Sequence, residues 1–214
     1  MLKPKYLKPV IFLLCLVPLL RLGWKALNSA LGANPVQVIT FSTGTWTLVF
    51  LLLTLSITPL RKMTRLYWLI QYRRMLGLFA FFYGCLHLLT YVWLDQFFEA
   101  HSIYKDVFKR PFITAGFTAF VLMVPLAATS TQKAIRRLGN RWQMLHRLIY
   151  ASALAGVIHY WWLVKKDVRR PEVYAGVLAA LLGYRLAVWA CSRGLALSAR
   201  DRIPGAVGES SAAD

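Results

Sequence analysis

Long apolar stretches alternate with short polar and basic segments along most of the chain. With its flanking residues, each stretch is long enough for a helix to cross about 30 Å of hydrocarbon. A membrane interior leaves helices as the way to satisfy the backbone in such stretches. The pattern therefore predicts an all-α integral membrane protein with six transmembrane helices. The predicted spans are 10–23, 40–57, 75–94, 112–128, 148–164 and 173–191.

The first stretch fits two interpretations. A basic start, a short apolar run and small residues near 30–33 are typical of a secretory signal peptide. We favour an uncleaved span, because Pro35 to Thr40 leads directly into the second stretch. The sequence thus predicts a membrane domain over residues 1–192. The segment 193–214 is predicted to be a polar, disordered cytoplasmic tail.

Composition and charge then distinguish between membrane and nucleic-acid partners. The 214 residues include 26 Lys or Arg and 8 Asp or Glu, giving a formal net charge of +18. Yet 58% of residues are hydrophobic and only 16% are charged, which argues against a basic nucleic-acid-binding domain. Most of the cations fall on the side of the predicted spans that carries both termini. This bias predicts cytoplasmic termini.

Three of the four histidines lie in or beside predicted spans. His87 and His159 fall at similar depth in the outer halves of the third and fifth spans, and each follows a glycine by three residues, Gly84 and Gly156. Positions i and i−3 share a helix face, so the glycines would make room for a flat group between the helices. The pattern predicts a b-type haem with two histidine ligands. The alternative is an interhelical hydrogen bond made by each histidine.

A second site is predicted near the cytoplasmic side. His146 lies about 20 Å along a helix from His159 and faces Arg73 and Arg74 on the third span, with Arg185 nearby. The site fits a second haem with another axial ligand, with His146 as an iron ligand. It also fits a flavin phosphate or a haem propionate, because arginine binds both in a bidentate way. Anchoring by positive-inside arginines and snorkelling are the simpler alternatives.

The remaining sequence features concern one further pocket residue and several functions that the sequence argues against. Tyr91, four residues after His87, is predicted to line the haem pocket or to pack. The three cysteines form no CxxC or CxxCH motif, which argues against a zinc site, a disulfide framework and covalent haem. No nucleotide-binding, protease or hydrolase motif is present, so no substrate-converting catalytic site is predicted. A transporter is disfavoured because every acidic residue lies in a loop or in the tail.

Ordered motifs over roughly residues 5–192 then indicate a family. Taken together, they resemble the MsrQ (YedZ) family, the haem-binding membrane subunits of the bacterial MsrPQ methionine sulfoxide reductase systems. The motifs are Thr43-Gly44-x-Trp46, Thr58-Pro59-Leu60-Arg61, Arg73-Arg74-x-Leu76-Gly77-Leu78, Leu86-His87, Lys109-Arg110-Pro111-Phe112-Ile113-Thr114-x-Gly116, Pro125-Leu126-Ala127-x-Thr129-Ser130, Arg137-Leu138-Gly139-x-x-Trp142-x-x-Leu145-His146-Arg147-Leu148, and His159 with Trp162.

The resemblance implies a ferric-reductase-like transmembrane fold in the bacterial inner membrane. It implies haem b and FMN as cofactors, with the haem-associated histidines at His87, His146 and His159. It also implies electron transfer from the quinone pool to the periplasmic molybdopterin enzyme MsrP, which repairs oxidised periplasmic proteins. The alternatives are a stand-alone transmembrane ferric or quinone reductase, or a passive membrane anchor for the partner.

Overall fold

The computed structural model describes residues 4–164 and 168–201, and within these ranges it contains helices and no strand. A 3₁₀ turn, η1 (Tyr67–Leu69), precedes α3, and a π-helical turn, η2 (Thr90–Asp95), follows it. The α-helices are α1 (Pro4–Leu27), α2 (Pro35–Thr64), α3 (Ile70–Leu89), α4 (Ala100–Lys109), α5 (Pro111–Ala128), α6 (Gln132–Leu138), α7 (Asn140–Leu145), α8 (Leu148–Leu163) and α9 (Arg169–Asp201).

The helical membrane architecture predicted from the sequence is confirmed. Among the described residues, five helical segments are long and apolar enough to cross a membrane: Leu7–Leu27, Pro35–Thr64, Tyr67–Asp95, Pro111–Ala128 and Arg169–Arg193. The remaining predicted span corresponds to α8, which has 16 residues and is shorter than the other five. The loops that separate the predicted spans also contain helices, namely α4, α6 and α7.

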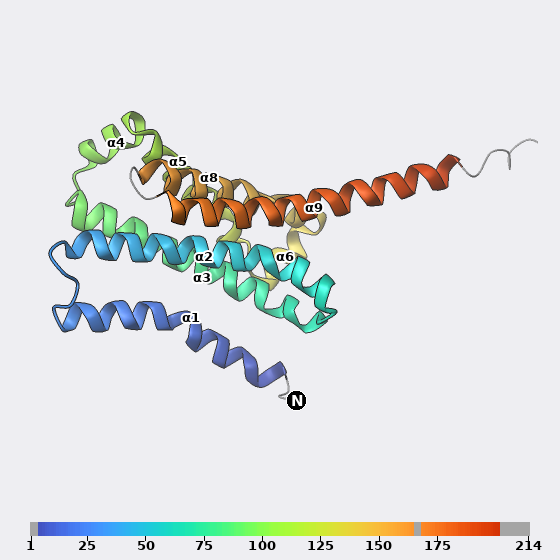
Figure 1. The fold of residues 1–214 in the computed structure, drawn as a ribbon, viewed down its shortest axis with the longest axis horizontal. Coiled ribbons are helices and arrows are strands. Elements are labelled where there is room, and N and C mark those ends of the chain that lie inside the picture. The colour runs from blue at the N-terminus through green and yellow to red at the C-terminus, as the bar shows by residue number, and fades with distance from the viewer. Residues whose placement is uncertain (1–3, 165–167, 202–214) are drawn as a thin grey trace, which may run out of the picture.

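The central bundle consists of two closely packed helix pairs, α2 with α3 and α5 with α8 (Figure 1). The peripheral helices α1 and α9 flank this bundle and bury little of their surface. We call the end of the bundle formed by Asn34, α4 and Leu163 the outer end, following the orientation predicted from the sequence. The opposite end, with α6 and α7, is called the inner end. Large apolar side chains of α1, such as Leu14 and Leu20, are exposed and suit a lipid environment.

Tyr83 attaches α1 to the bundle. Its hydroxyl donates a hydrogen bond to the Cys15 carbonyl (2.9 Å) and accepts one from the Leu19 amide (3.1 Å). These are positions i and i+4 of α1, which would otherwise bond to each other, so the tyrosine is inserted into the helix ladder next to Pro18. Tyr83 is 1% exposed and therefore fixes α1 against α3 from within the core.

The helix ends explain how the inner and outer connections form. Asn34 caps α2 by accepting a hydrogen bond from the Gln37 amide, and Pro35 occupies the first turn. Helix α5 also begins with a proline, Pro111, but the extended residue Arg110 before it makes no side-chain cap. At its far end α9 continues to Asp201, so residues 193–201, predicted to be disordered, are helical. The rest of that predicted tail, 202–214, lies outside the described residues.

Candidate functional site

A cavity of about 680 Å³ lies between α2, α3, α5 and α8 in the outer half of the bundle. Its inner part is apolar and is lined by Leu48, Leu51, Phe120 and Met123. Towards the outer end it reaches polar residues of the connecting segments. The volume falls within the range of about 300–1,000 Å³ that is typical of cofactor and ligand sites.

His87 on α3 and His159 on α8 both line this cavity. Their ring centroids lie 6.0 Å apart, and the ring planes are inclined at 71°. A metal ion bound between two imidazoles through bonds of about 2 Å would separate the centroids by roughly 6 Å. The structure therefore brings together the two histidines at the spacing that a metal between them requires.

The hydrogen bonds of the two rings determine which nitrogen faces the cavity. Nδ1 of His87 donates to the carbonyl of Thr40 (3.0 Å), and Nδ1 of His159 donates to the carbonyl of Phe112 (2.6 Å). A carbonyl only accepts, so in each neutral ring Nδ1 carries the proton and Nε2 keeps its lone pair. This arrangement, with one nitrogen tied to a backbone carbonyl, is the usual one for metal-ligating histidine.

Two glycines provide the space for these rings. A Cβ on Gly44 would lie 2.9 Å from Cε1 of His87, and a Cβ on Gly116 would lie 2.7 Å from Nδ1 of His159. Each glycine follows the accepting carbonyl by four residues on the same helix, Thr40 before Gly44 and Phe112 before Gly116. The surroundings of the two histidine rings are thus built alike, one on α2 and one on α5.

The other predicted pocket residues are placed as follows. Gly84, Gly156 and Tyr91 all line the cavity. A Cβ on Gly84 would meet Met123 at 3.1 Å, whereas one on Gly156 would make only an ordinary contact with Leu48 at 3.7 Å. Tyr91 also donates a hydrogen bond to Asp106 at the outer end.

The predicted inner site lies outside this cavity. Arg73 is half-buried and lies close enough to Arg61, Arg185 and Tyr150 to interact with them electrostatically. Arg185 donates hydrogen bonds to the Tyr150 hydroxyl and to the Leu55 carbonyl, and its guanidinium stacks 4.9 Å from the Tyr150 ring centroid. Arg74, which was predicted to belong to this group, is exposed.

His146 belongs to the inner site. Its ring stacks on Trp142 with centroids 3.9 Å apart, and its Nδ1 bonds to the Trp142 carbonyl. Burial, together with the nearby charge of Arg73, lowers the pKa of His146 below its ordinary value. The ring is therefore neutral near pH 7, and its buried Nε2 has no hydrogen-bond partner among the described residues.

Unpaired donors indicate what the inner site could bind. The buried Nε atoms of Arg61 and Arg185 also lack partners within the described part of the chain. The ion pair found among the described residues, Arg110 with Asp106, lies at the outer end. Three arginines, one each from α2, α3 and α9, lie close together at the inner end, and no ion pair with an acidic residue is found there among the described residues. Such a cluster is suited to bind an anionic group such as a phosphate or carboxylate.

Sequence reasoning missed five residues that shape these sites. Thr40 and Phe112 act through their backbone carbonyls, which every residue has, so their side chains do not reveal this role. Gly44 and Gly116 were noticed as parts of motifs but were not connected with the histidines. The signal was present, because each glycine falls in a stretch that resembles the family. Arg61 was likewise seen only as part of a motif at the inner end of α2.

The comparisons with known proteins first define the class of protein. Residues 41–157 match the family described as "Ferric reductase like transmembrane component". This segment runs from α2 into α8, includes His87 and ends two residues before His159. No solved structure matches the chain.

Curated relatives define the family more narrowly. The chain is 54% identical over 192 residues to a protein of Bordetella parapertussis, covering 89% of this chain and 93% of that protein. It is 52% identical to a protein of Herminiimonas arsenicoxydans, with 86% and 85% covered, and 56% identical to one of Azospira oryzae, with 84% and 78% covered. All three are named "Protein-methionine-sulfoxide reductase heme-binding subunit MsrQ". The chain therefore belongs to the MsrQ family, as its motifs predicted.

Proposed function

We propose that this chain is the membrane electron-transfer subunit of a methionine sulfoxide reductase system. It passes electrons from the quinone pool through b haem to the periplasmic molybdopterin enzyme MsrP, for repair of oxidised periplasmic proteins. It resides in the bacterial inner membrane with both termini in the cytoplasm. The observation that carries the proposal is the His87–His159 pair at a ring spacing of 6.0 Å across one cavity.

His87 and His159 bind the haem iron through Nε2 in this proposal. Bound haem supplies one-electron chemistry at a potential that its ligands and surroundings adjust. The chain's own residues hold the imidazoles in place: Thr40 and Phe112 fix the ring orientation, and Gly44 and Gly116 let the rings lie against the opposite helices. The apolar residues of the inner part of the cavity, such as Leu51 and Met123, would limit the access of water to a bound haem.

The inner site marks the side on which electrons enter. Arg73 and Arg185, joined by Arg61, bind the phosphate of FMN or the propionate of a haem. Arg74 is exposed and contributes only to the surrounding positive field. His146 lies beside Arg73 with Nε2 unpaired. It is the ligand available for a second haem, although the described residues offer no second histidine opposite it.

The electron donor and acceptor are both external to the chain. Its sequence contains no nicotinamide-binding motif. Among the described residues, no three His, Cys, Asp or Glu side chains come together as a metal site. A redox relay requires neither a general acid nor a base of its own. The partner is proposed from the name shared by the relatives, which are described as subunits of a methionine sulfoxide reductase.

Reconstitution into lipid vesicles tests the proposed direction of electron flow. The purified chain is inserted with the MsrP partner on one side and a reduced quinone in the bilayer, and methionine sulfoxide reduction is followed. We expect turnover that requires both the chain and the quinol, and that is lost in His87→Ala. Partner recruitment without turnover or a haem spectrum would support a passive anchor. Direct reduction of ferric iron without the partner would support a stand-alone reductase.

A further inference from the structure

The outer end of the haem cavity contains a charged residue whose role the histidine pair does not explain. Of the described residues that line the cavity, only Asp95 and Arg110 carry a formal charge. Both lie at the outer end, whereas the inner part around Leu51 and Met123 is apolar. If a cofactor with carboxylate groups binds here, its carboxylates can meet a charged partner only at the outer end of the cavity.

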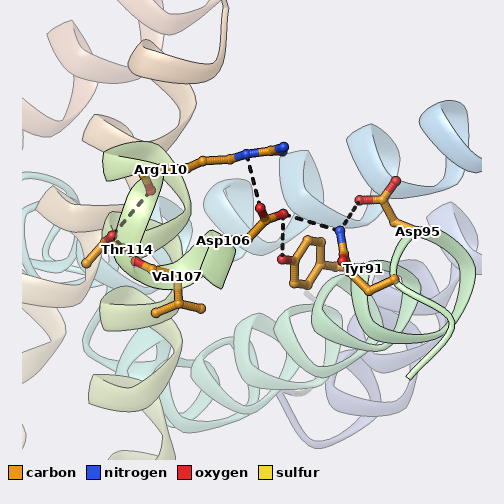
Figure 2. Close-up of polar contacts among 7 residues, drawn as sticks. Tyr91, Asp95, Asp106, Val107, Arg110 and Thr114 are labelled. Carbon is orange, nitrogen blue, oxygen red and sulfur yellow. Dashed lines mark hydrogen bonds and ion pairs between the residues drawn. The ribbon is translucent and has the colours of Figure 1, made fainter. Parts of the chain in front are cut away.

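Arg110 forms an ion pair with Asp106, and its own side chain is 55% exposed. Nε of Arg110 lies 3.2 Å from Oδ1 of Asp106, and the aspartate side chain is largely buried. The other carboxylate oxygen accepts hydrogen bonds from the Tyr91 hydroxyl and the Gln96 amide, both at 3.3 Å. Figure 2 shows this network, with the guanidinium extended beyond the carboxylate.

One side of the Arg110 guanidinium is not used by the ion pair with Asp106. The ion pair engages Nε, so the two terminal nitrogens remain available for a second carboxylate. A guanidinium binds a carboxylate through two parallel hydrogen bonds, which gives both strength and orientation. Asp106 balances one charge unit and restricts the side chain, so less conformational entropy is lost when the second partner binds.

The same segment also holds an iron ligand. Arg110 immediately precedes α5, and the carbonyl of Phe112, two residues further, accepts the Nδ1 proton of His159. The first turn of α5 and the residue before it therefore contact His159 and also reach the outer end of the cavity. A contact between Arg110 and a carboxylate of the bound cofactor would therefore be made by the same segment that orients His159.

We propose that Arg110, positioned by Asp106, binds a propionate carboxylate of the haem at the outer end of the cavity. This inference rests on the proposed haem-binding function. Arg110 is a binding residue and Asp106 a positioning residue. Without the positive charge the propionate is not neutralised, so the reduced haem is less stable and the haem is held less tightly.

The test compares Arg110→Gln and Arg110→Lys with Lys109→Gln in the full chain purified in detergent. Lys109 is an exposed neighbour that does not line the cavity, so its variant removes the same charge from the same segment. The measurements are the haem midpoint potential at several pH values and the rate of haem transfer to an acceptor apoprotein. Asp106→Asn is added as the variant that frees Arg110 without removing it.

We expect Arg110→Gln to keep the bis-histidine spectrum, to lower the midpoint potential and to release haem about tenfold faster. Its potential should also depend more steeply on pH between about pH 5 and 8, because the unpaired propionate then titrates in that range. Arg110→Lys should show smaller changes in the same direction. Asp106→Asn should release haem faster, because Arg110 is no longer positioned, without the lowered potential, since this variant removes a negative charge. Lys109→Gln should change neither quantity.

A potential and a release rate in Arg110→Gln equal to those of Lys109→Gln would overturn the assignment of Arg110 while leaving the histidine pair intact. If Arg110→Gln does not fold, unchanged values in Arg110→Lys and Asp106→Asn would overturn it equally. A wild-type chain that binds no haem would contradict the proposed function itself.

Discussion

The imidazole rings of His87 and His159 lie 6.0 Å apart, and each is held by a helix to which it does not belong. His87 on α3 bonds to a carbonyl of α2, and His159 on α8 bonds to a carbonyl of α5. Each closely packed helix pair of the bundle therefore also holds one of the two histidines. A change in how α2 packs on α3, or α5 on α8, will move one of the proposed haem ligands directly.

Alanine substitutions at Gly44 and Gly116 should remove haem. In Gly44→Ala the new methyl group would lie 2.9 Å from His87, and in Gly116→Ala 2.7 Å from His159. Relieving such contacts costs about 1–3 kcal/mol, so haem content at limiting haem should fall roughly tenfold. The measurement is haem per purified chain.

Gly176→Ala is the matched control for these two glycine variants. Gly176 lies on α9 with no atom within 4 Å of the new methyl position. Its haem content should equal that of the wild type. Full haem content in Gly44→Ala and Gly116→Ala would show that the glycines do not shape the surroundings of the histidine rings.

Substitutions in the inner arginine cluster should weaken the binding of an anionic cofactor. Arg73→Gln, Arg61→Gln and Arg185→Gln each remove one donor group of the cluster. Each should raise the dissociation constant for FMN about tenfold, since a charge-assisted pair contributes roughly 1.5–3 kcal/mol. Flavin per chain and FMN titration are the measurements, with exposed Arg74→Gln as the matched control.

The double variant of Arg73 and Arg74 separates cofactor binding from membrane anchoring. Flavin content should fall in this variant to the level of Arg73→Gln alone. Unchanged flavin in the three single variants of the cluster and in the double variant would assign these arginines to anchoring at the membrane surface. A lower yield of inserted protein with unchanged flavin would support the same conclusion.

Tyr83→Phe should loosen α1 without affecting haem. The variant removes the hydroxyl that bridges the Cys15 carbonyl and the Leu19 amide, so α1 loses this polar attachment to α3 even where the two groups bond to each other instead. The expected cost is about 1 kcal/mol, seen as faster amide exchange in α1. Tyr67→Phe, at an exposed position, is the control. Loss of haem in Tyr83→Phe would contradict its placement outside the cavity.

The sequence predicted the parts of this protein that depend on hydrophobic pattern and on costly polar residues. The helical membrane bundle followed from six apolar stretches. His87 and His159 stood out because an ionisable group within a span needs a partner or a role. Equal depth on two helices that run in the same direction then suggested that the rings meet.

Other features depend on tertiary packing, which the pattern does not encode. The backbone carbonyls of Thr40 and Phe112 are invisible as side-chain chemistry. The space for the rings comes from Gly44 and Gly116 on the opposite helices, whereas the sequence pointed to Gly84 and Gly156 on the same helices as the histidines. In the same way, Arg61 joins Arg73 only because α2 packs along α3, while Arg74 turns outward.

The account is tested most directly by a reduced-minus-oxidised absorption spectrum with haem counted per chain. The purified wild-type protein should give a b-type spectrum with two histidine ligands. His87→Ala and His159→Ala should each lose the same haem, and exposed His101→Ala should retain it. An unchanged spectrum and haem content in His87→Ala would contradict the paired-ligand site, and with it the proposed path of electrons through this bundle.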